Sequence, residues 1–480
     1  MASVRDEIRT VEALADRLTR NRTSRREFLA AASGLSAAAL LASSGDAAGT
    51  SVTIPFYTTE GDPISLAVYR SVIAKFRQQH PEADVKINIY QDEDSLQILE
   101  TAFRTGTDVG VFVAPATQIA GWAAGGYLLP LSDIVQKIGA SDFLPGTRIV
   151  VGGEDYAIVY QANASALYYR KDLLDGAGIK PPRTYDHYVA ATKELNEKDG
   201  VVGIASSISS APQQALQFFA PYVYQSGWDY FGRDGGVLFA REEVLAAVRR
   251  YAAVMRNTRE SFYNSGFGPI LTTYIAGKAA FATFPGRLGV NCFRQAPDIA
   301  AKTGVIGLPA GPFMTGRLHY GGIQRYVIYR KTGNPGLAKE FLLALTTGDN
   351  ALAFALTVPG HLLPGLRSVG AKLRNAVTAS NDPYLKAHGD WVVTFLDLAP
   401  NAMNPATSMG SVHDRQFTGR NSIVCPWGSE VWTSPPVDGT MLQSILINNA
   451  DPGTAWKNAS EKMNAIATKW KKDHPDWKPA

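Results

Sequence analysis

The amino-acid sequence predicts an α/β fold built as two lobes. In the first third of the chain, segments with strand-like alternation are separated by segments with helical periodicity, which is typical of an open α/β sheet. The same order resumes in the middle of the chain. No long linker divides the 480 residues, which are enough for two or three domains. We therefore expect two α/β lobes between which the chain crosses more than once.

Three strands and three helical stretches are predicted first. Residues 51–57 and 83–90 place apolar side chains at every second position, and residues 107–114 have the pattern of a buried strand. Residues 65–81 share one apolar helical face and end at a proline, and another helical stretch leads to the strand at 107–114. Residues 118–134 begin as a helix that ends at Gly-Gly. Strands therefore alternate with helices.

Capping residues and periodicity predict the later elements. Thr184, Asn334 and Asp451 stand directly before helical patterns, so we expect their side chains to accept backbone N–H bonds as N-caps. Residues 201–206 are predicted as a further strand. The last helix is the clearest, because its apolar side chains recur every three or four residues. They are Trp456, Ala459, Met463, Ile466 and Trp470.

The first 48 residues are predicted to be a leader. Arg25 and Arg26 precede Phe28, Leu29 and a weakly apolar run that is shorter than the ~20 residues a membrane span needs. A basic pair, a short apolar run and then small residues indicate a cleavable export signal, and the string SRREFL resembles the twin-arginine signal. A buried, Ala-rich helix is the alternative. We exclude residues 1–48 from the fold prediction and expect export by the twin-arginine machinery.

Composition excludes several classes of protein. With 47 Lys and Arg against 43 Asp and Glu, the chain is too balanced to bind nucleic acid through bulk charge. Beyond the leader no apolar run is long enough for a membrane span. Cys292 and Cys425 both lie far from the expected cleavage region, so we expect an exported protein without a lipid anchor. The two cysteines would be able to pair in an oxidising compartment, and the sequence leaves this open.

Several segments together resemble the extracellular solute-binding proteins of ABC importers, in the sugar-binding class that includes the maltose-binding protein. The segment 156–195 contains a Tyr-rich strand followed by KDL, AGI and PPRT. Further matches follow in the family's order, and only residues 370–438 are poorly matched. The matching segments are AGKAAFATFPGRLG, GVIGLPAGP, the segment 319–347, PGHLLPGL and the segment 441–466.

This resemblance implies a periplasmic-binding-protein-like fold, in which a hinge of several crossings joins the lobes and the ligand lies between them. It implies a monomer that binds a carbohydrate or sugar derivative in the periplasm, uses no cofactor and delivers the solute to an ABC permease. An acidic or polyol solute is the alternative ligand. We expect crossings at 157–163, 320–324 and 362–366, lobe one at 49–160 and 324–364, and lobe two at 163–320 and 366–480.

Motifs for catalysis or metal binding are not found. The seven histidines form no i, i+4 pair of the zinc-helix type, and the chain has no nucleophile elbow and no Walker motif. A glycan-processing enzyme needs two carboxylates placed across a bond, and the sequence cannot show their separation. A secreted enzyme of this kind therefore remains the alternative to a binding protein.

Candidate ligand-binding residues follow from the rule that ligands lie beyond the carboxyl ends of strands in an open α/β sheet. Aromatic rings suit sugar faces, and planar polar groups suit hydroxyls. Three loops of lobe one supply Tyr57, Thr59, Glu60, Asp62, Gln91, Asp92, Thr117 and Gln118. Lobe two and the crossings supply Tyr224, Trp228, Phe284, Arg287, Gln324, His361, Trp427 and Trp432.

Arg287 marks a departure from the family pattern. Many relatives have a stacking Trp two residues after the glycine of this segment, where this chain has Leu288. The arginine can instead form forked hydrogen bonds to hydroxyls or to an anion. We expect Arg287 and Trp228 to face the same cleft, and a surface position for Arg287 is the alternative.

Overall fold

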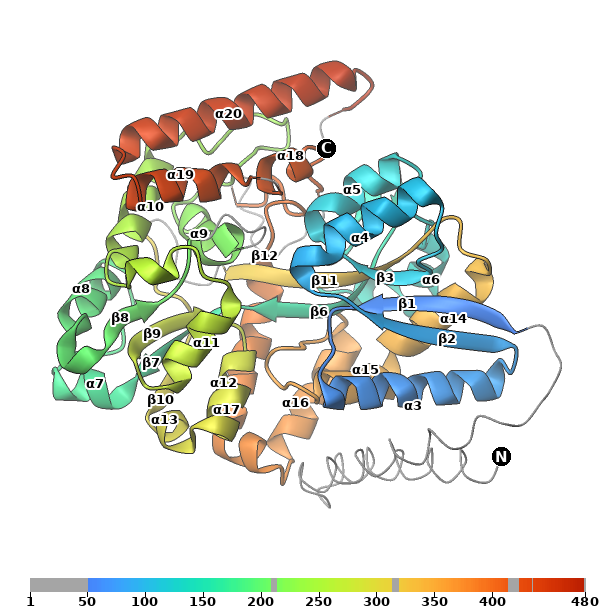
Figure 1. Cartoon of the computed structure of the whole chain (residues 1–480), viewed down its shortest axis with the longest axis horizontal. Coiled ribbons are helices and arrows are strands. Elements are labelled where there is room, and N and C mark those ends of the chain that lie inside the picture. Colours follow the sequence, from blue (N-terminus) through green and yellow to red (C-terminus); the bar gives the residue numbers. More distant parts are fainter. Residues whose placement is uncertain (1–50, 209–213, 313–318, 413–422, 434, 479–480) are drawn as a thin grey trace.

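The computed structural model describes residues 51–208, 214–312, 319–412, 423–433 and 435–478. It confirms two α/β lobes, each built around its own sheet (Figure 1). The predicted leader, residues 1–48, lies outside the described residues.

The sheet of the first lobe has the strand order β12-β11-β3-β1-β2, and β6 pairs with β11. Strand β1 is parallel to β2 and β3, whereas β11 is antiparallel to β3 and β6. The strands predicted at 51–57, 83–90 and 107–114 are confirmed, although the third begins later because Gly110 takes a left-handed φ of 51°. The strands are β1 (Val52–Thr58), β2 (Ala83–Ile89), β3 (Val111–Ala114), β6 (Ile158–Ala164), β11 (His319–Ile328) and β12 (Ala402–Met403).

Helices surround this sheet because each buries one apolar face against it. Asp62 begins the first of them, since its side chain accepts the N–H groups of Ile64 and Ser65. A short hairpin, β4 (Val150–Val151) with β5 (Glu154–Asp155), lies beside the sheet. The helices are α3 (Pro63–Gln79), α4 (Asp92–Thr105), α5 (Ala116–Ala124), α6 (Ser132–Ile138), α14 (Pro335–Thr346) and α15 (Gly348–Ala355).

The sheet of the second lobe has the order β10-β7-β9-β8, with only β8 and β9 parallel. Its strands are β7 (Ala166–Arg170), β8 (Val202–Ala205), β9 (Ala279–Phe284) and β10 (Thr303–Ile306). The helices that follow β7 and lie before β10 are α7 (Lys171–Gly176), α8 (Tyr185–Leu195), α9 (Gln214–Tyr224), α10 (Glu242–Met255), α11 (Phe267–Ile275), α12 (Arg287–Gln295) and α13 (Pro297–Ala301). The later helices are α16 (Arg367–Thr378), α17 (Pro383–Leu398), α18 (Gly428–Trp432), α19 (Val437–Leu446) and α20 (Pro452–Asp473).

All three predicted N-caps are confirmed. Thr184 Oγ1 accepts the N–H of His187 at 3.3 Å, at the start of α8. Asn334 Oδ1 and Asp451 Oδ1 accept the third N–H group of α14 and of α20, at 3.0 and 2.8 Å. These bonds satisfy backbone donors that a helix end otherwise leaves without partners.

Three segments lie side by side where the chain passes between the sheets. Strands β6 and β11 pair over residues 158–164 and 321–326, and both run between the two lobes in Figure 1. The third segment joins them, since the carbonyl of Leu363 accepts the N–H of Ala162 at 2.7 Å. A Cβ on Gly365 would lie 2.2 Å from the Val159 side chain, which explains the glycine there. The predicted lobe boundaries stay a prediction.

Two further features of the described residues are the state of the cysteines and the character of the helices. Cys292 and Cys425 are both buried and both free thiols, and burial raises the pKa of Cys292 to about 12. Within the described ranges, no helix has both the length and the apolar character that crossing a membrane requires.

A buried carboxyl makes the stability of the second lobe depend on pH. Asp438 is fully buried at the start of α19, where Tyr230 Oη donates to it at 3.1 Å, and burial raises its pKa to about 6. The folded state therefore binds a proton more tightly than the unfolded chain, so we expect the free energy of unfolding to fall as pH rises through the range from about 4 to 6. In Asp438→Asn this contribution should be missing, so urea unfolding at several pH values should show a smaller fall than in the wild type. In the exposed control Asp175→Asn the full fall should persist, and an unchanged pH dependence in Asp438→Asn would contradict the assignment.

Candidate functional site

Two candidate residues from different lobes form an ion pair. Glu60 lies in the loop after β1, and Arg287 is the first residue of α12, directly after the loop that follows β9. Arg287 Nη2 lies 2.8 Å from Glu60 Oε2, within hydrogen-bond distance. The Glu60 side chain is 11% exposed and that of Arg287 is 27% exposed. The pair thus joins the carboxyl end of a strand in one sheet to the corresponding end in the other.

Burial shifts the pKa of Glu60 and that of nearby His361. Burial raises the pKa of Glu60, Arg287 opposes that shift, and nearby Asp62 adds to it. The pKa of His361 is held well below its usual value by burial and by the positive charge of Arg287. His361 is therefore a neutral imidazole at pH 7 and offers one donor and one acceptor.

His361 lies close to the start of α12 because its segment packs against the residue before Arg287. Gly286 packs directly on Gly360, where a Cβ on Gly286 would lie 2.2 Å from a backbone carbon. Gln161 Nε2, from β6, lies 3.5 Å from His361 Nε2 and donates to the His361 carbonyl at 3.4 Å. The buried Nδ1 of His361 has no hydrogen-bond partner among the described residues.

Gln161 is a residue of this site that the sequence analysis did not nominate. It lies on the first predicted crossing, in a strand whose other side chains are mostly apolar. Two buried amides in such a strand, Gln161 and Asn163, are a signal that could have nominated it, because buried polar groups require partners. Gln161, Glu60, Arg287 and His361 form what we call the cleft cluster.

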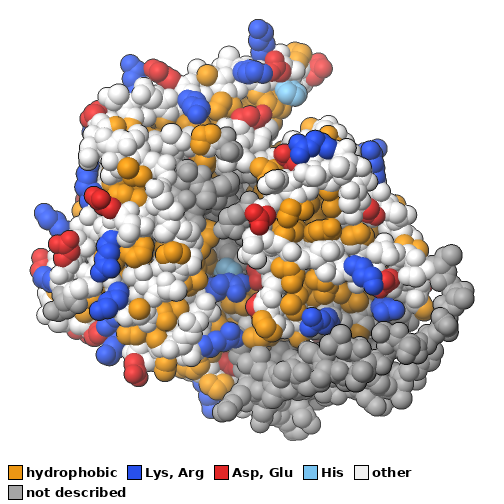
Figure 2. All heavy atoms as spheres, in the orientation of Figure 1, with side chains coloured by type: hydrophobic (Ala, Val, Ile, Leu, Met, Phe, Trp, Pro, Cys, Tyr) orange, Lys and Arg blue, Asp and Glu red, His pale blue; other side chains and the backbone are white. Residues whose placement is uncertain are grey.

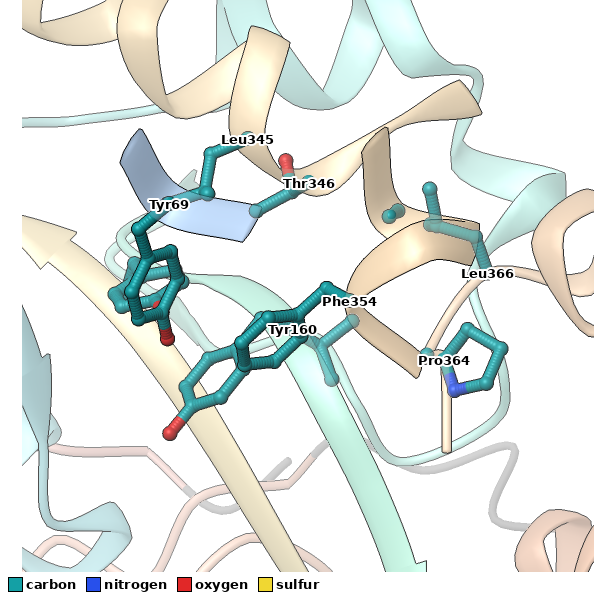
Figure 3. A pocket seen from close by; sticks show the side chains of 11 residues that line it. Tyr69, Tyr160, Leu345, Thr346, Phe354, Pro364 and Leu366 are labelled. Carbon is teal, nitrogen blue, oxygen red and sulfur yellow. The ribbon is translucent and has the colours of Figure 1, made fainter. Parts of the chain in front are cut away.

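A chain of hydroxyl groups connects the cleft cluster to the crossing strands. Tyr326 Oη on β11 lies 2.8 Å from Tyr69 Oη, which lies 3.1 Å from Thr58 Oγ1. That hydroxyl accepts the N–H of Glu60 at 3.2 Å. Tyr69 also lines a small cavity beside the crossings, together with Tyr160, Phe354 and Pro364 (Figure 3). The Glu60 loop is therefore held against β11.

A second contact between the lobes involves Gln118, at the start of α5. Gln118 is 7% exposed, and its Nε2 donates to Thr433 Oγ1, directly after α18, at 2.9 Å.

The remaining candidates of lobe one and of the crossings are less buried than Gln118 where the structure describes their side chains. Tyr57, Thr59, Thr117 and Gln324 are half-buried and Gln91 is exposed, whereas the Asp92 side chain lies outside the described residues.

Four aromatic candidates of lobe two are placed in the core, which corrects the expectation that their rings face a ligand. Trp427 and Trp432 are 0% exposed and pack edge to face on Phe231. Tyr224 is buried on α9, and Phe284 packs at 5.9 Å on Phe267. Burial of large apolar rings is favourable wherever a partner surface exists, and α20 supplies one for Trp427 through Trp470.

Among the aromatic candidates of lobe two, Trp228 is the one that is half-buried. The Arg241 guanidinium lies over its ring, 4.6 Å from the centroid. That Trp228 and Arg287 face one cleft stays a prediction.

The molecular surface fits a site between the lobes. Figure 2 shows a groove between the two halves of the molecule, with a histidine and basic side chains inside it. The described residues hold no group of three or more His, Cys, Asp or Glu side chains placed to bind a metal ion. The cleft cluster therefore offers one carboxylate, one guanidinium, one imidazole and one amide for hydrogen bonding.

Comparison with known proteins identifies relatives along most of the chain. The family model for bacterial extracellular solute-binding proteins matches residues 61–351. The putative ABC transporter periplasmic-binding protein YcjN of Escherichia coli is 21% identical over 445 residues, 87% of this chain and 93% of that protein. The lactose-binding protein of Rhizobium radiobacter is 26% identical over 289 residues, 57% of this chain and 65% of that protein. The maltose-bound MalE3 of T. maritima has the same fold, with a TM-score of 0.68 and 22% identity, and the match covers 87% of this chain and all of that one.

Proposed function

The chain belongs to the family of bacterial extracellular solute-binding proteins, and we propose that it captures a carbohydrate or sugar derivative outside the cytoplasm and delivers it unchanged to the permease of an ABC importer. The observation that carries this proposal is the cleft cluster, in which both lobes and a crossing strand contribute polar groups. Carboxylate, guanidinium, imidazole and amide groups all hydrogen-bond hydroxyls. The lactose-binding protein of Rhizobium radiobacter and the maltose-bound MalE3 support a ligand of this class.

The proposal is tested by identifying the ligand. The exported protein is titrated with a panel of sugars and polyols while Trp fluorescence is measured, and any co-purified ligand is identified by mass spectrometry. Saturable binding of a sugar that is recovered intact is the expected result. Recovery of a cleaved sugar would instead indicate the secreted glycan-processing enzyme, and saturable binding to none of the panel would contradict a carbohydrate receptor.

Export by the twin-arginine route, as a monomer without a lipid anchor, is part of the proposal. It rests on Arg25 and Arg26 directly before a short, weakly apolar run. Changing both to lysine keeps the charge but removes the arginine pair, so we expect the protein to stay in the cytoplasm in cell fractionation. Changing Arg20 and Arg22 to lysine is the matched control and should leave export intact. Undiminished export of the Arg25/Arg26 variant would show that another route is used.

Arg287 is expected to contribute directly to affinity. Arg287→Ala removes charge-assisted hydrogen bonds, each of about 1.5–3 kcal/mol, which corresponds to a roughly tenfold to hundredfold weaker Kd for the sugar. Arg287→Lys should recover only part of this, because an ammonium group does not reproduce the planar fork of a guanidinium. Calorimetric titration measures both variants. Arg374→Ala, which removes an exposed pair with Asp397, should bind like the wild type, and equal affinity of Arg287→Ala would remove Arg287 from the site.

A further inference from the structure

The cationic group of the cleft cluster is already engaged by a carboxylate of the protein itself. Arg287 Nη2 contacts Glu60 Oε2 at 2.8 Å, and the Glu60 side chain is only 11% exposed. We propose that Glu60 is a specificity-determining residue which, by holding Arg287, makes the site select neutral polyhydroxyl solutes and reject anionic ones. This inference rests on the proposed function and separates its two alternative ligand classes, neutral sugar and acidic solute.

An anionic solute meets two costs at this site. To bind Arg287 it must displace Glu60 from the guanidinium, which leaves a buried carboxylate without its partner, and such a charge is strongly unfavourable. If Glu60 stays in place, the solute's negative charge lies beside a carboxylate, and like charges held close together in a partly buried site repel. Asp62, near enough to raise the pKa of Glu60, adds to this repulsion.

A neutral hydroxyl meets neither cost. It can donate to a carboxylate oxygen and accept from a guanidinium N–H at the same time. The contact of the pair uses one carboxylate oxygen and one guanidinium nitrogen, so a hydroxyl group can bridge Glu60 and Arg287 without separating them. His361, neutral at pH 7, adds the unpartnered ring nitrogen Nδ1 beside them.

The second arginine of α12, Arg294, also has acidic neighbours. Arg294, about two turns along α12 from Arg287, lies within electrostatic range of the carboxylates of Asp62 and Asp382. Both arginines of α12 that face these groups therefore have acidic neighbours. These acidic neighbours weaken the attraction that the two arginines of α12 exert on an anion, which is in line with the proposal.

Glu60→Gln tests the proposal because it keeps the shape of the side chain and removes its charge. The probes are pairs that differ only by a carboxylate, glucose with glucuronate and galactose with galacturonate, titrated by calorimetry at low ionic strength. The wild type should prefer the neutral member of each pair. Glu60→Gln should bind the acidic members roughly tenfold or more tightly than the wild type does, since a charge-assisted bond to Arg287 replaces repulsion. Glu340→Gln, which removes a carboxylate 3.3 Å from His80 outside the cleft cluster, should behave as the wild type.

The double variant Glu60→Gln/Arg287→Gln separates this effect from misfolding. It should lose the gain in affinity for acids while its thermal unfolding stays close to that of Glu60→Gln. An unchanged affinity of Glu60→Gln for both acids, or a wild type that prefers the acids, would overturn the specificity proposal and leave the receptor function intact. Failure of the proposed function would give a different result: neither the wild type nor Glu60→Gln would bind any neutral or acidic sugar in the wider panel.

Discussion

Replacing Arg325 with methionine is expected to destabilise the protein by about 3–9 kcal/mol, because three buried carbonyl groups lose their donor at a cost of roughly 1–3 kcal/mol each. Arg325 lies on β11 and is 0% exposed. Its Nε donates to the Thr147 carbonyl at 2.8 Å, Nη1 to Ile323 at 2.9 Å and Nη2 to Gly146 at 3.0 Å. Methionine fills the volume of the side-chain stem but satisfies none of these acceptors.

The position of Arg325 makes this loss relevant to the hinge. The pairing of β11 with β6 is irregular between Gln324 and Arg325, where the two crossing strands lie together. The guanidinium therefore fastens the loop at Gly146 and Thr147 to a crossing strand. Urea unfolding measures the change in stability, and Arg374→Met, at an exposed arginine, should cost less than about 0.5 kcal/mol. A loss below about 1 kcal/mol in Arg325→Met would mean that the three carbonyl groups find other donors.

Elements whose signals are local were predictable from the sequence. The strand over 51–57 shows its alternation within seven residues, and the caps Thr184, Asn334 and Asp451 each act on an N–H group three residues away. Asp62 belongs to the same class, yet the sequence analysis placed it only among the loop candidates. In the structure its carboxylate caps α3, which a proline at the first helical position also indicates.

Pairings between distant residues were not predictable. Glu60 and Arg287 were nominated separately, for different reasons, and 227 positions separate them. Their contact depends on how the two lobes sit around the crossings, which periodicity does not encode. The same limit explains why the buried rings were not predicted. Trp427 packs on Trp470 of α20, and the sequence around residue 427 does not show that these two residues are neighbours.

The buried rings also give the second large effect, because Trp432→Ala is expected to destabilise the protein by about 3–5 kcal/mol, as truncation of large buried aromatic side chains does. Trp432 is 0% exposed and packs edge to face on Tyr230, with ring centroids 5.5 Å apart. Trp432→Phe keeps most of the packing and should cost distinctly less. Urea unfolding measures both variants.

Trp228→Ala is the matched comparison, because its ring is half-buried and lies under Arg241 at 4.6 Å. Removing this ring forfeits a cation–π contact of about 0.5–1 kcal/mol, so its stability should stay much closer to that of the wild type. Calorimetric titration with the identified sugar then separates the two roles. If Trp228 faces the cleft, its variant loses affinity while it keeps its stability, and the Trp432 variant loses stability first. A Trp432→Ala protein as stable as the wild type but weaker in binding would return this ring to the ligand site, since a core ring cannot be removed without leaving a cavity.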